Sequence, residues 1–387
     1  MMIGVGEIYK VVVAVAPLYT ALGLGYGSVR WWHIFTPEQC EAINLLVSYF
    51  TLPFFVFEFT IHADPFSMNY QFILADVISK VVIVSILFAW AKCSSKGSYG
   101  WSITTFSLST LTNSLVVGVP MLNAMYGPSA QDLVVQSSIF QGIVWLVLLL
   151  FVLEFRKVKI GIPTKPGVVS NQYSHVVSID ISPSSKDTAA AAAAAAAATT
   201  TTTNNNDQNT NSVADHELLI AKPSFCSLMR IVWFKLALNP NSYASIIGIT
   251  WAFISNRWHF EMPSIMEGSI LVMSKAGTGM AMFSMGLFMA LQEKLVASGP
   301  SLMAFGMVMK FIAGPAAMAI GAIAVGLRGD VLRIAIIQAA LPQSITSFIF
   351  ARDYGLHADV LSTAVIFGML VSLPVLVAYY FLFGLMS

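Results

Sequence analysis

Long apolar stretches separated by short polar turns fill two blocks of the chain, residues 7–155 and 231–384. A membrane-spanning helix needs about 20 predominantly apolar residues, and each stretch has roughly that length. Backbone groups in hydrocarbon must find their hydrogen-bond partners within the protein, so we expect these stretches to be helices. Ten are predicted, at residues 7–27, 40–61, 70–92, 101–125, 132–155, 231–255, 267–290, 300–326, 332–351 and 359–384. The pattern predicts an all-α membrane protein.

The two blocks also repeat local sequence. Ile139-Phe140 follows Tyr126-Gly127, and Ile366-Phe367 follows Tyr354-Gly355 at nearly the same distance. A membrane protein built from two related halves is typical of secondary transporters, whose substrate site lies where the halves meet. The repetition therefore predicts a transporter.

Composition agrees with the membrane prediction. Apolar residues make up 57% of the 387 positions and charged residues 10%, whereas soluble domains carry roughly 25% charged residues. The net charge of +1 gives no reason to expect a nucleic-acid partner. The three cysteines lack the spacing of a disulfide framework, and the histidines lack that of a metal site. Phosphate-binding loops and nucleophile elbows are absent from the sequence, so we expect neither an enzyme, nor a cofactor, nor an ATP-driven pump.

The basic residues predict an orientation. If the amino terminus lies outside the cytosol, the cytosolic side holds Arg30, Lys92, Lys96, Arg156, Lys157, Lys159, Lys165, Lys222, Arg230, Lys294 and Arg352. The opposite side keeps little more than Arg257, Arg328 and Arg333. This asymmetry satisfies the positive-inside rule and places both termini on the non-cytosolic side.

A polar segment, residues 156–226, separates a first half at 1–155 from a second half at 227–387. It contains runs of alanine, threonine and asparagine between residues 189 and 206. Such tracts cannot bury enough apolar surface to offset the entropy of ordering, so we expect a disordered cytosolic loop. Its serines either accept phosphate or simply belong to a solvated linker.

Helix-breaking residues occur at matching places in the two halves. Asn113-Ser114 and Pro120 interrupt the fourth predicted span, and Pro342-Gln343 interrupts the ninth. Proline and glycine are common in membrane helices, which is the simplest explanation for either span alone. Interruptions at corresponding positions favour two broken helices that cross at a transport site. There, the amino ends of half-helices present free N–H groups to an anion.

Three polar positions add candidate chemistry. Asn113 can hydrogen-bond a carboxylate without the desolvation cost of a buried charge. The run at residues 239–243 either brings the amide of Asn241 to the site or forms an ordinary helix cap. Gln141 either faces the substrate or bonds neighbouring helices.

Asp76 and Lys80 stand four residues apart, on one face of the third predicted span. Charges inside a membrane usually pair or line a pathway, so this pair either supports the crossing or binds a coupling proton. The alternative is a pair that reaches toward the membrane surface. Lys310 recurs in the equivalent span of the second half and favours a functional role. Glu58 and His62 are expected near a membrane interface.

The chain resembles the plant PIN-FORMED auxin carriers over both membrane blocks. The shared text is EIYKV at residues 7–11, NSLVVGVP at 113–120, NPNSY at 239–243, GTGMAMFS at 277–284, IIQAALPQ at 336–343 and LSTAVIFGML at 361–370. Motifs this long and in this order are highly specific. The resemblance implies two inverted five-helix repeats with crossing broken helices, as in bile-acid and sodium/proton carriers. It also implies a scaffold part (spans 1, 2, 6 and 7), a transport part (spans 3–5 and 8–10) and a homodimer joined through the scaffold.

The implied substrate is indole-3-acetic acid, bound as an anion by a lipid-embedded protein without a cofactor. The family's pocket maps onto Asn113 and Asn241 as amide contacts, and onto Leu52, Leu146 and Ile345 as walls. By the same resemblance, Ser114, Pro120, Pro342 and Gln343 mark the helix crossing, and Asp76 and Lys80 form a supporting pair.

The sequence departs from the family pattern at several positions. Leu146 stands where a long-loop member can carry tyrosine, and Glu58 stands where many members carry histidine. Ser344 and Ser347 replace the glycine and proline that commonly follow the Pro-Gln step. The loop is far shorter than in long-loop members. In this respect the chain resembles the short-loop branch of the family, which is associated with the endoplasmic reticulum membrane. A plasma-membrane location is the alternative.

Two other functions stay open from the sequence. One is an organic-anion symporter of the bile-acid type, coupled to sodium or protons. Asp76 faces Lys80 and leaves no spare acidic group, so voltage-driven uniport by an elevator-type movement is preferred. The other is a receptor-like membrane scaffold, which the paired broken helices disfavour.

Overall fold

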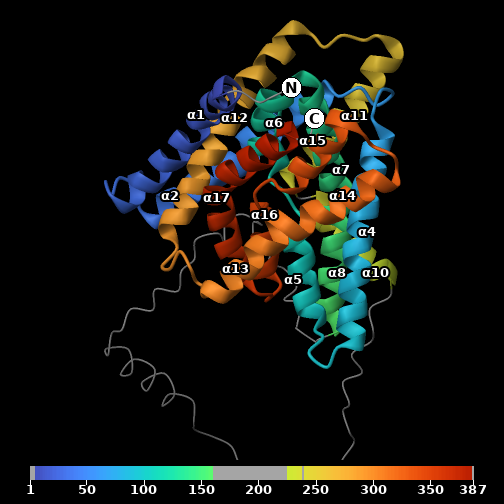
Figure 1. The fold of residues 1–387 in the computed structure, drawn as a ribbon. Coiled ribbons are helices and arrows are strands. Elements are labelled where there is room, and N and C mark those ends of the chain that lie inside the picture. The colour runs from blue at the N-terminus through green and yellow to red at the C-terminus, as the bar shows by residue number, and fades with distance from the viewer. Residues whose placement is uncertain (1–4, 160–224, 238, 386–387) are drawn as a thin grey trace, which may run out of the picture. The chain divides into compact units, whose positions relative to one another are not determined.

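The computed structural model describes residues 5–159, 225–237 and 239–385, which belong to one compact unit. These residues form α-helices and four π-helical turns, without a named strand (Figure 1). The helices are α1 (Val5–Arg30), α2 (Pro37–Leu46), α3 (Leu52–Ile61), α4 (Tyr70–Cys93), α5 (Tyr99–Thr110), α6 (Val119–Tyr126), α7 (Pro128–Phe140), α8 (Leu146–Lys159), α10 (Phe225–Ala237), α11 (Pro240–Trp258), α12 (Ser264–Leu291), α13 (Pro300–Val308), α14 (Gly314–Ala324), α15 (Gly329–Ala339), α16 (Ile345–Asp353) and α17 (Ala358–Leu385). The π-helical turns are η1 (Val47–Thr51), η2 (Ser114–Gly118), η3 (Gln141–Trp145) and η4 (Met309–Ala313).

The all-helical membrane prediction is confirmed. Within the described ranges, seven helical stretches are long and apolar enough to cross a membrane. They are Tyr9–Arg30, Pro37–Ile61, Tyr70–Cys93, Pro128–Lys157, Ser264–Leu291, Pro300–Ala324 and Ala358–Leu385. Their outward faces carry large apolar side chains such as Val81, Ile86 and Val272, which is the surface that lipid requires.

The remaining three predicted spans are interrupted. The span expected at 231–255 is wrong as one helix, because α10 ends at Ala237 and α11 begins at Pro240. Proline cannot donate the hydrogen bond that would continue α10, and its fixed φ suits the first position of a new helix. The side chain of Asn239 accepts a hydrogen bond from the amide of Asn241 and caps α11.

Three of the four π-helical turns precede a proline by two residues. Pro53 follows η1, Pro120 follows η2 and Pro315 follows η4. Each proline removes one backbone donor from the helix, and the preceding turn widens to accommodate the lost bond. Pro120 therefore shapes the start of α6 and does not itself form the break in the fourth span.

The two breaks lie against each other. The first separates α5 from η2 at residues 111–113, and the second separates α15 from α16 at residues 340–344. Thr112 and Gln343 form an isolated antiparallel bridge. The amide of Asn113 donates to the carbonyl of Pro342 at 2.8 Å, and that of Ser344 donates to the carbonyl of Leu111 at 3.4 Å. Each break thus supplies a hydrogen-bond partner for a backbone group of the other break that has none within its own helix.

Close backbone packing joins α1 to α12, which lie side by side in Figure 1. A β-carbon on Gly25 would lie 2.1 Å from the carbonyl oxygen of Phe283, and one on Gly286 would lie 2.1 Å from that of Leu22. Any larger residue at either position would force the helices apart. Small residues at such contacts are the usual means of tight helix packing in membranes.

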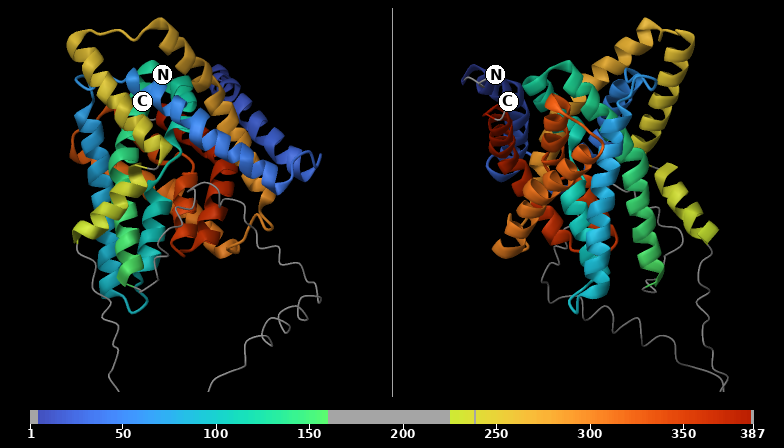
Figure 2. Two further views of the ribbon diagram at one scale, coloured as in Figure 1. Left: turned by 180° about the vertical axis from the view of Figure 1, so that it is seen from behind. Right: turned by 45° about the vertical axis from the view of Figure 1, so that its right-hand side comes forward.

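The ends of the described chain lie together at one end of the bundle (Figures 1 and 2). The turn between α4 and α5, the end of α8 and the start of α10 lie at the opposite end in these views. Residues 160–224 of the expected cytosolic loop, 156–226, lie outside the described part of the chain. The described flanks of that loop, residues 156–159 and 225–226, are helical.

Candidate functional site

A cavity of about 210 Å³ opens beside the paired breaks. This volume far exceeds the ~10–15 Å³ that one ordered water occupies. Its walls come from α2, η1 and α3, from η3 and α8, from α11 and α12, and from the first residues after each break. Segments far apart in the sequence therefore meet around one space.

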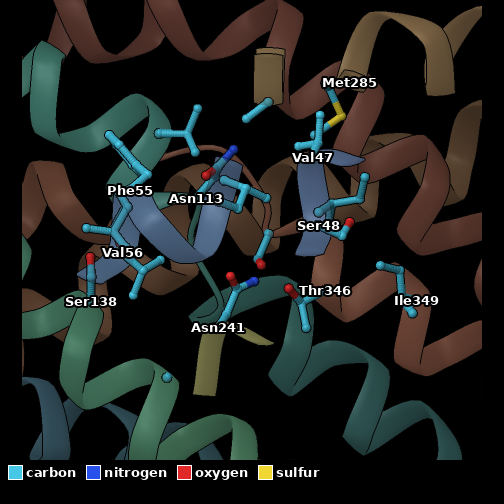
Figure 3. Close-up of a pocket in the computed structure, with 18 of the residues that line it drawn as sticks. Val47, Ser48, Phe55, Val56, Asn113, Ser138, Asn241, Met285, Thr346 and Ile349 are labelled. Atoms are coloured by element: carbon cyan, nitrogen blue, oxygen red, sulfur yellow. The ribbon is translucent and has the colours of Figure 1, made fainter. Parts of the chain in front are cut away.

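The six predicted substrate-binding residues all line this cavity. They are Leu52, Asn113, Gln141, Leu146, Asn241 and Ile345. Figure 3 shows Asn113 and Asn241 reaching into the same space from different elements. Of the predicted crossing residues, Ser114 lines the cavity, whereas Pro342 and Gln343 lie in the second break. The carbonyl of Pro342 accepts from the amide of Asn113, and the side chain of Gln343 donates to the carbonyl of Ser107 in α5. Pro120, Asp76 and Lys80 are not among the lining residues.

Two helical segments begin at the cavity. One starts at Ser114 and runs through η2 into α6, and the other is α16, which starts at Ile345. The residues before them, Asn113 and Ser344, have non-helical backbone angles and make no side-chain capping bond. The first N–H groups of a helix lack intrahelical acceptors and carry a partial positive charge. Their convergence gives this cavity two anion-attracting ends.

Two side-chain amides in the cavity wall have an unpartnered atom. Asn44 accepts a hydrogen bond of 2.5 Å from Ser284, but its Nδ2 has no partner among the described residues. The Oδ1 of Asn241 is likewise buried without one. Buried polar atoms in native proteins are nearly always hydrogen-bonded, so both atoms indicate a cavity that holds polar molecules. Asn44 gave no signal in the sequence beyond being polar in an apolar run.

Gln141 holds the first break. Its Nε2 donates to the carbonyl of Thr112 at 2.9 Å, and its Oε1 accepts from the amide and hydroxyl of Thr112, each at 3.2 Å. The amide is thus engaged on both atoms. Of the two alternatives from the sequence, this geometry favours helix bonding over contact with a substrate.

Asp76 and Lys80 form a buried ion pair. The ammonium nitrogen lies 2.8 and 2.7 Å from the two carboxylate oxygens, and the residues are only 8% and 3% exposed. This burial contradicts the alternative that the pair reaches toward the membrane surface. Trp145 donates to Asp76 at 3.0 Å, and the ammonium lies 4.9 Å from the centre of its ring. Trp145 was not singled out in the sequence, because a tryptophan in an apolar span has an ordinary packing role.

The pair borders a second cavity of about 20 Å³. Thr112, Gln141 and Gln338 also line it, which connects the pair to both broken segments. The Oε1 of Gln338 is buried there without a partner among the described residues. A space of this size and polarity suits one water molecule.

Two other predicted charged positions lie outside the lining of both cavities. Lys310 is fully buried in η4 and donates to the carbonyl of Leu111, at the end of α5, at 3.0 Å. Glu58 lies in α3 and accepts a hydrogen bond of 3.3 Å from Ser274 of α12. Its carbonyl lies 2.8 Å from Nδ1 of His62. Lys310 therefore meets the crossing, whereas Glu58 belongs to a contact between helices outside the cavity.

Comparison with known proteins agrees with an all-helical membrane transporter. Residues 10–380 match the family of membrane transport proteins. The chain is 64% identical over 381 residues to auxin efflux carrier component 5 of Arabidopsis thaliana, covering 98% of both proteins. It is 65% identical over 381 residues to probable auxin efflux carrier component 5a of Oryza sativa subsp. japonica, again covering 98% of both.

A more distant relative has a longer chain. Probable auxin efflux carrier component 1b of Oryza sativa subsp. japonica is 33% identical over an alignment of 554 residues, covering 99% of this chain and all of the relative. Because this chain has 387 residues, the alignment needs long gaps here. With a family match across both membrane blocks and full-length relatives of this similarity, the chain belongs to the membrane transport protein family, as a short-loop member of its PIN-FORMED auxin efflux carriers.

Proposed function

We propose that this protein carries auxin, as the indole-3-acetate anion, across a membrane. The names of its close relatives support auxin as the substrate. The observation that carries the proposal is the cavity itself, where two helix amino ends and the amides of Asn113 and Asn241 meet apolar walls. The polar groups suit the carboxylate, and Leu52, Leu146 and Ile345 suit the indole ring.

The proposed movement is of the elevator type. In this proposal α1, α2, α3, α11 and α12 form a fixed scaffold, and the helices that carry the breaks form the moving part. Wall residues come from both parts: Leu52 and Asn241 from the scaffold, and Asn113, Leu146 and Ile345 from the moving part. A sliding movement would therefore carry one wall of the site past the other. We further propose that the ten predicted spans form two inverted repeats, and that two copies associate through the scaffold.

The proposed driving force is the membrane voltage. Moving one charge through 100 mV is worth about 2.3 kcal/mol, which allows roughly fiftyfold accumulation. Asp76 lies beside the crossing, and its charge is balanced by Lys80 at 2.7 Å. A balanced carboxylate offers little attraction to a coupling cation, which supports uniport.

Proton- or sodium-coupled symport remains the second candidate because of one observation. The small cavity beside Asp76 also holds the unpartnered Oε1 of Gln338 and several hydroxyl groups. Oxygen atoms of this kind are the ligands that hard cations prefer. The fixed ammonium of Lys80 in the same wall opposes a cation there.

Flux in proteoliposomes tests both candidates. Purified protein would be reconstituted, and uptake of radiolabelled indole-3-acetate would be measured under a potassium diffusion potential without a sodium or pH gradient. Uniport predicts uptake that follows the voltage in sign and size. Uptake driven by a sodium or pH gradient at zero voltage, with the anion concentration held fixed, would establish symport instead. Absence of uptake under every gradient would contradict auxin transport.

The proposed location is the endoplasmic reticulum membrane, with the loop in the cytosol and both termini on the other side. The short loop supports this membrane over the plasma membrane. The end of α4 and the end of α8 lie opposite the termini (Figures 1 and 2). Lys92 and Lys96 lie at and just after the end of α4, and Arg156 and Lys157 lie in the last turns of α8, which supports the orientation.

A further inference from the structure

Lys310 is a buried lysine that the proposed transport cycle does not yet use. Its side chain is fully buried in η4, and its Nζ donates to the carbonyl of Leu111 at 3.0 Å. In the part of the chain that the structure describes, the ion pairs within 4.0 Å do not include Lys310. Burying a lysine away from water without a carboxylate partner costs free energy, so a lysine kept at the crossing points to a functional role there.

The other buried lysine at the crossing differs in this respect. Lys80 is neutralised by Asp76, so the two contribute no net charge. Lys310 has no carboxylate partner among these ion pairs, and its amine lies at the first break, next to the carbonyl end of α5. A protonated Lys310 would therefore give the crossing a charge of the sign that an anionic substrate requires.

The contact with Leu111 has a specific electrostatic effect. Leu111 is the C-cap of α5, so its carbonyl stands at the negative end of that helix. Only two residues separate it from Ser114, where the next helix begins with its positive end at the cavity. A carboxylate at Ser114 would feel attraction from one helix and repulsion from the other. An ammonium on the carbonyl of Leu111 cancels the repulsion.

We propose that Lys310 is protonated and makes the site selective for anions, by neutralising the carbonyl end of α5 behind the substrate carboxylate. It does not line the cavity, so it acts through the break as a positioning residue and does not touch the substrate. This inference rests on the proposed function, because it concerns the charge preference of the same cavity.

The test compares two ligands of similar shape, indole-3-acetate and the uncharged indole-3-acetamide. Binding to purified full-length protein would be measured for the parent and for Lys310→Met, Lys310→Gln and Lys310→Arg. Lys294→Met serves as control, because it removes the same charge from an exposed position in the turn between α12 and α13. Each protein's folded fraction would be determined by thermal melting.

We expect Lys310→Met and Lys310→Gln to lose affinity for indole-3-acetate by roughly tenfold, the size of a helix-end charge effect in a buried setting. Affinity for indole-3-acetamide should change by less than about twofold, within the scatter of a surface substitution. Lys310→Arg and Lys294→Met should keep the parent's preference for the anion. Lys310→Gln retains a donor for Leu111, so its result separates the charge from the hydrogen bond.

If the neutral variants lose affinity for both ligands to the same extent, Lys310 is a structural residue and the inference is overturned. Unchanged binding of both ligands would overturn it as well. If neither neutral variant folds while Lys310→Arg does, the charge serves folding and the inference also fails. Failure of the parent to bind indole-3-acetate would instead refute the proposed function, which keeps the two results distinguishable.

Discussion

The backbone amide of Asn113 donates a hydrogen bond of 2.8 Å to the carbonyl oxygen of Pro342, joining the two broken helices directly. Because the backbone of Asn113 is held in this way, its side chain is left to face the cavity. The same residue thus fixes the crossing through its main chain and offers an amide to a ligand.

Asn113→Ala should weaken auxin binding by about 1–3 kcal/mol, because a buried carboxylate oxygen would lose a donor. The effect would be measured by direct binding to purified protein. Asn123→Ala, at an exposed position of α6, provides the matched control. Unchanged affinity in a folded Asn113→Ala protein would remove this residue from the site.

Gln141→Leu should lower stability and leave auxin affinity per folded molecule nearly unchanged. The substitution leaves the amide and carbonyl of Thr112 without their partner, at a cost of about 1–3 kcal/mol. Thermal melting and ligand binding on the same sample would separate the two effects. A large loss of affinity at normal stability would show that Gln141 contacts the substrate after all.

Lys80→Met should destabilise the protein by about 3–5 kcal/mol, because it leaves the carboxylate of Asp76 buried and unpaired. Transport should slow. It should also become dependent on protons, because a buried carboxylate that has lost its ammonium partner favours the protonated form. Adding Asp76→Asn removes the stranded charge and should recover much of the stability. Equal instability of the single and double variants would argue against a coupled pair.

Acidification should destabilise the turn between α16 and α17 through His357. Its Nδ1 lies 2.9 Å from the hydroxyl of Thr104, and its ring stacks on Trp101. Partial burial, followed by the charge of Arg156, lowers the pKa of His357 below its ordinary value of 6.5. The folded state therefore favours neutral imidazole, and its stability falls as pH drops from the ordinary value through the lowered one.

The effect of His357 should be small, because the residue is only partly buried and solvent screens the charge of its ring. Melting temperatures would be compared between about pH 7.5 and about pH 5, a window that spans the ordinary histidine pKa. His357→Gln should show a smaller drop than the parent. An identical drop in both proteins would mean that other groups control the acid response.

Deleting residues 170–215 should leave auxin flux largely intact. These residues lie outside the described part of the chain, and their low-complexity sequence predicts a tether that contributes little to the membrane core. Flux would be normalised to the amount of folded protein in the liposomes. Loss of flux in a well-folded deletion would give the segment an ordered role.

Much of the framework could be predicted from apolar length and from helix breakers. Seven predicted spans coincide with membrane-length helices in the described part of the chain, because the bilayer imposes that length whatever the packing. The resemblance further identified Asn113 and Asn241, which line one cavity although they are distant in sequence. Asn239 and Pro240 are residues typical of a helix start, but the sequence prediction placed them inside one continuous span.

The partners of individual atoms could not be predicted. Gln141 on Thr112, Lys310 on Leu111 and Trp145 on Asp76 are contacts between different helices. Such contacts depend on helix rotation and on π-helical turns, which shift a side chain's direction without changing the apolar pattern. Asn44 was missed for the same reason, since its exposure to the cavity depends on how α2 meets α12.

The mutual pairing of the two breaks also bears on how the chain is made. Thr112 leaves the ribosome 343 − 112 = 231 residues before its partner Gln343. At about 5–20 residues per second, synthesis of that interval takes roughly 12–46 s. During this time the amide of Asn113 and the carbonyl of Leu111 lack their partners from the second half, and each such group is costly in hydrocarbon. We therefore expect these groups of the first half to be hydrated or bound by the insertion machinery until the second half has been synthesised and inserted.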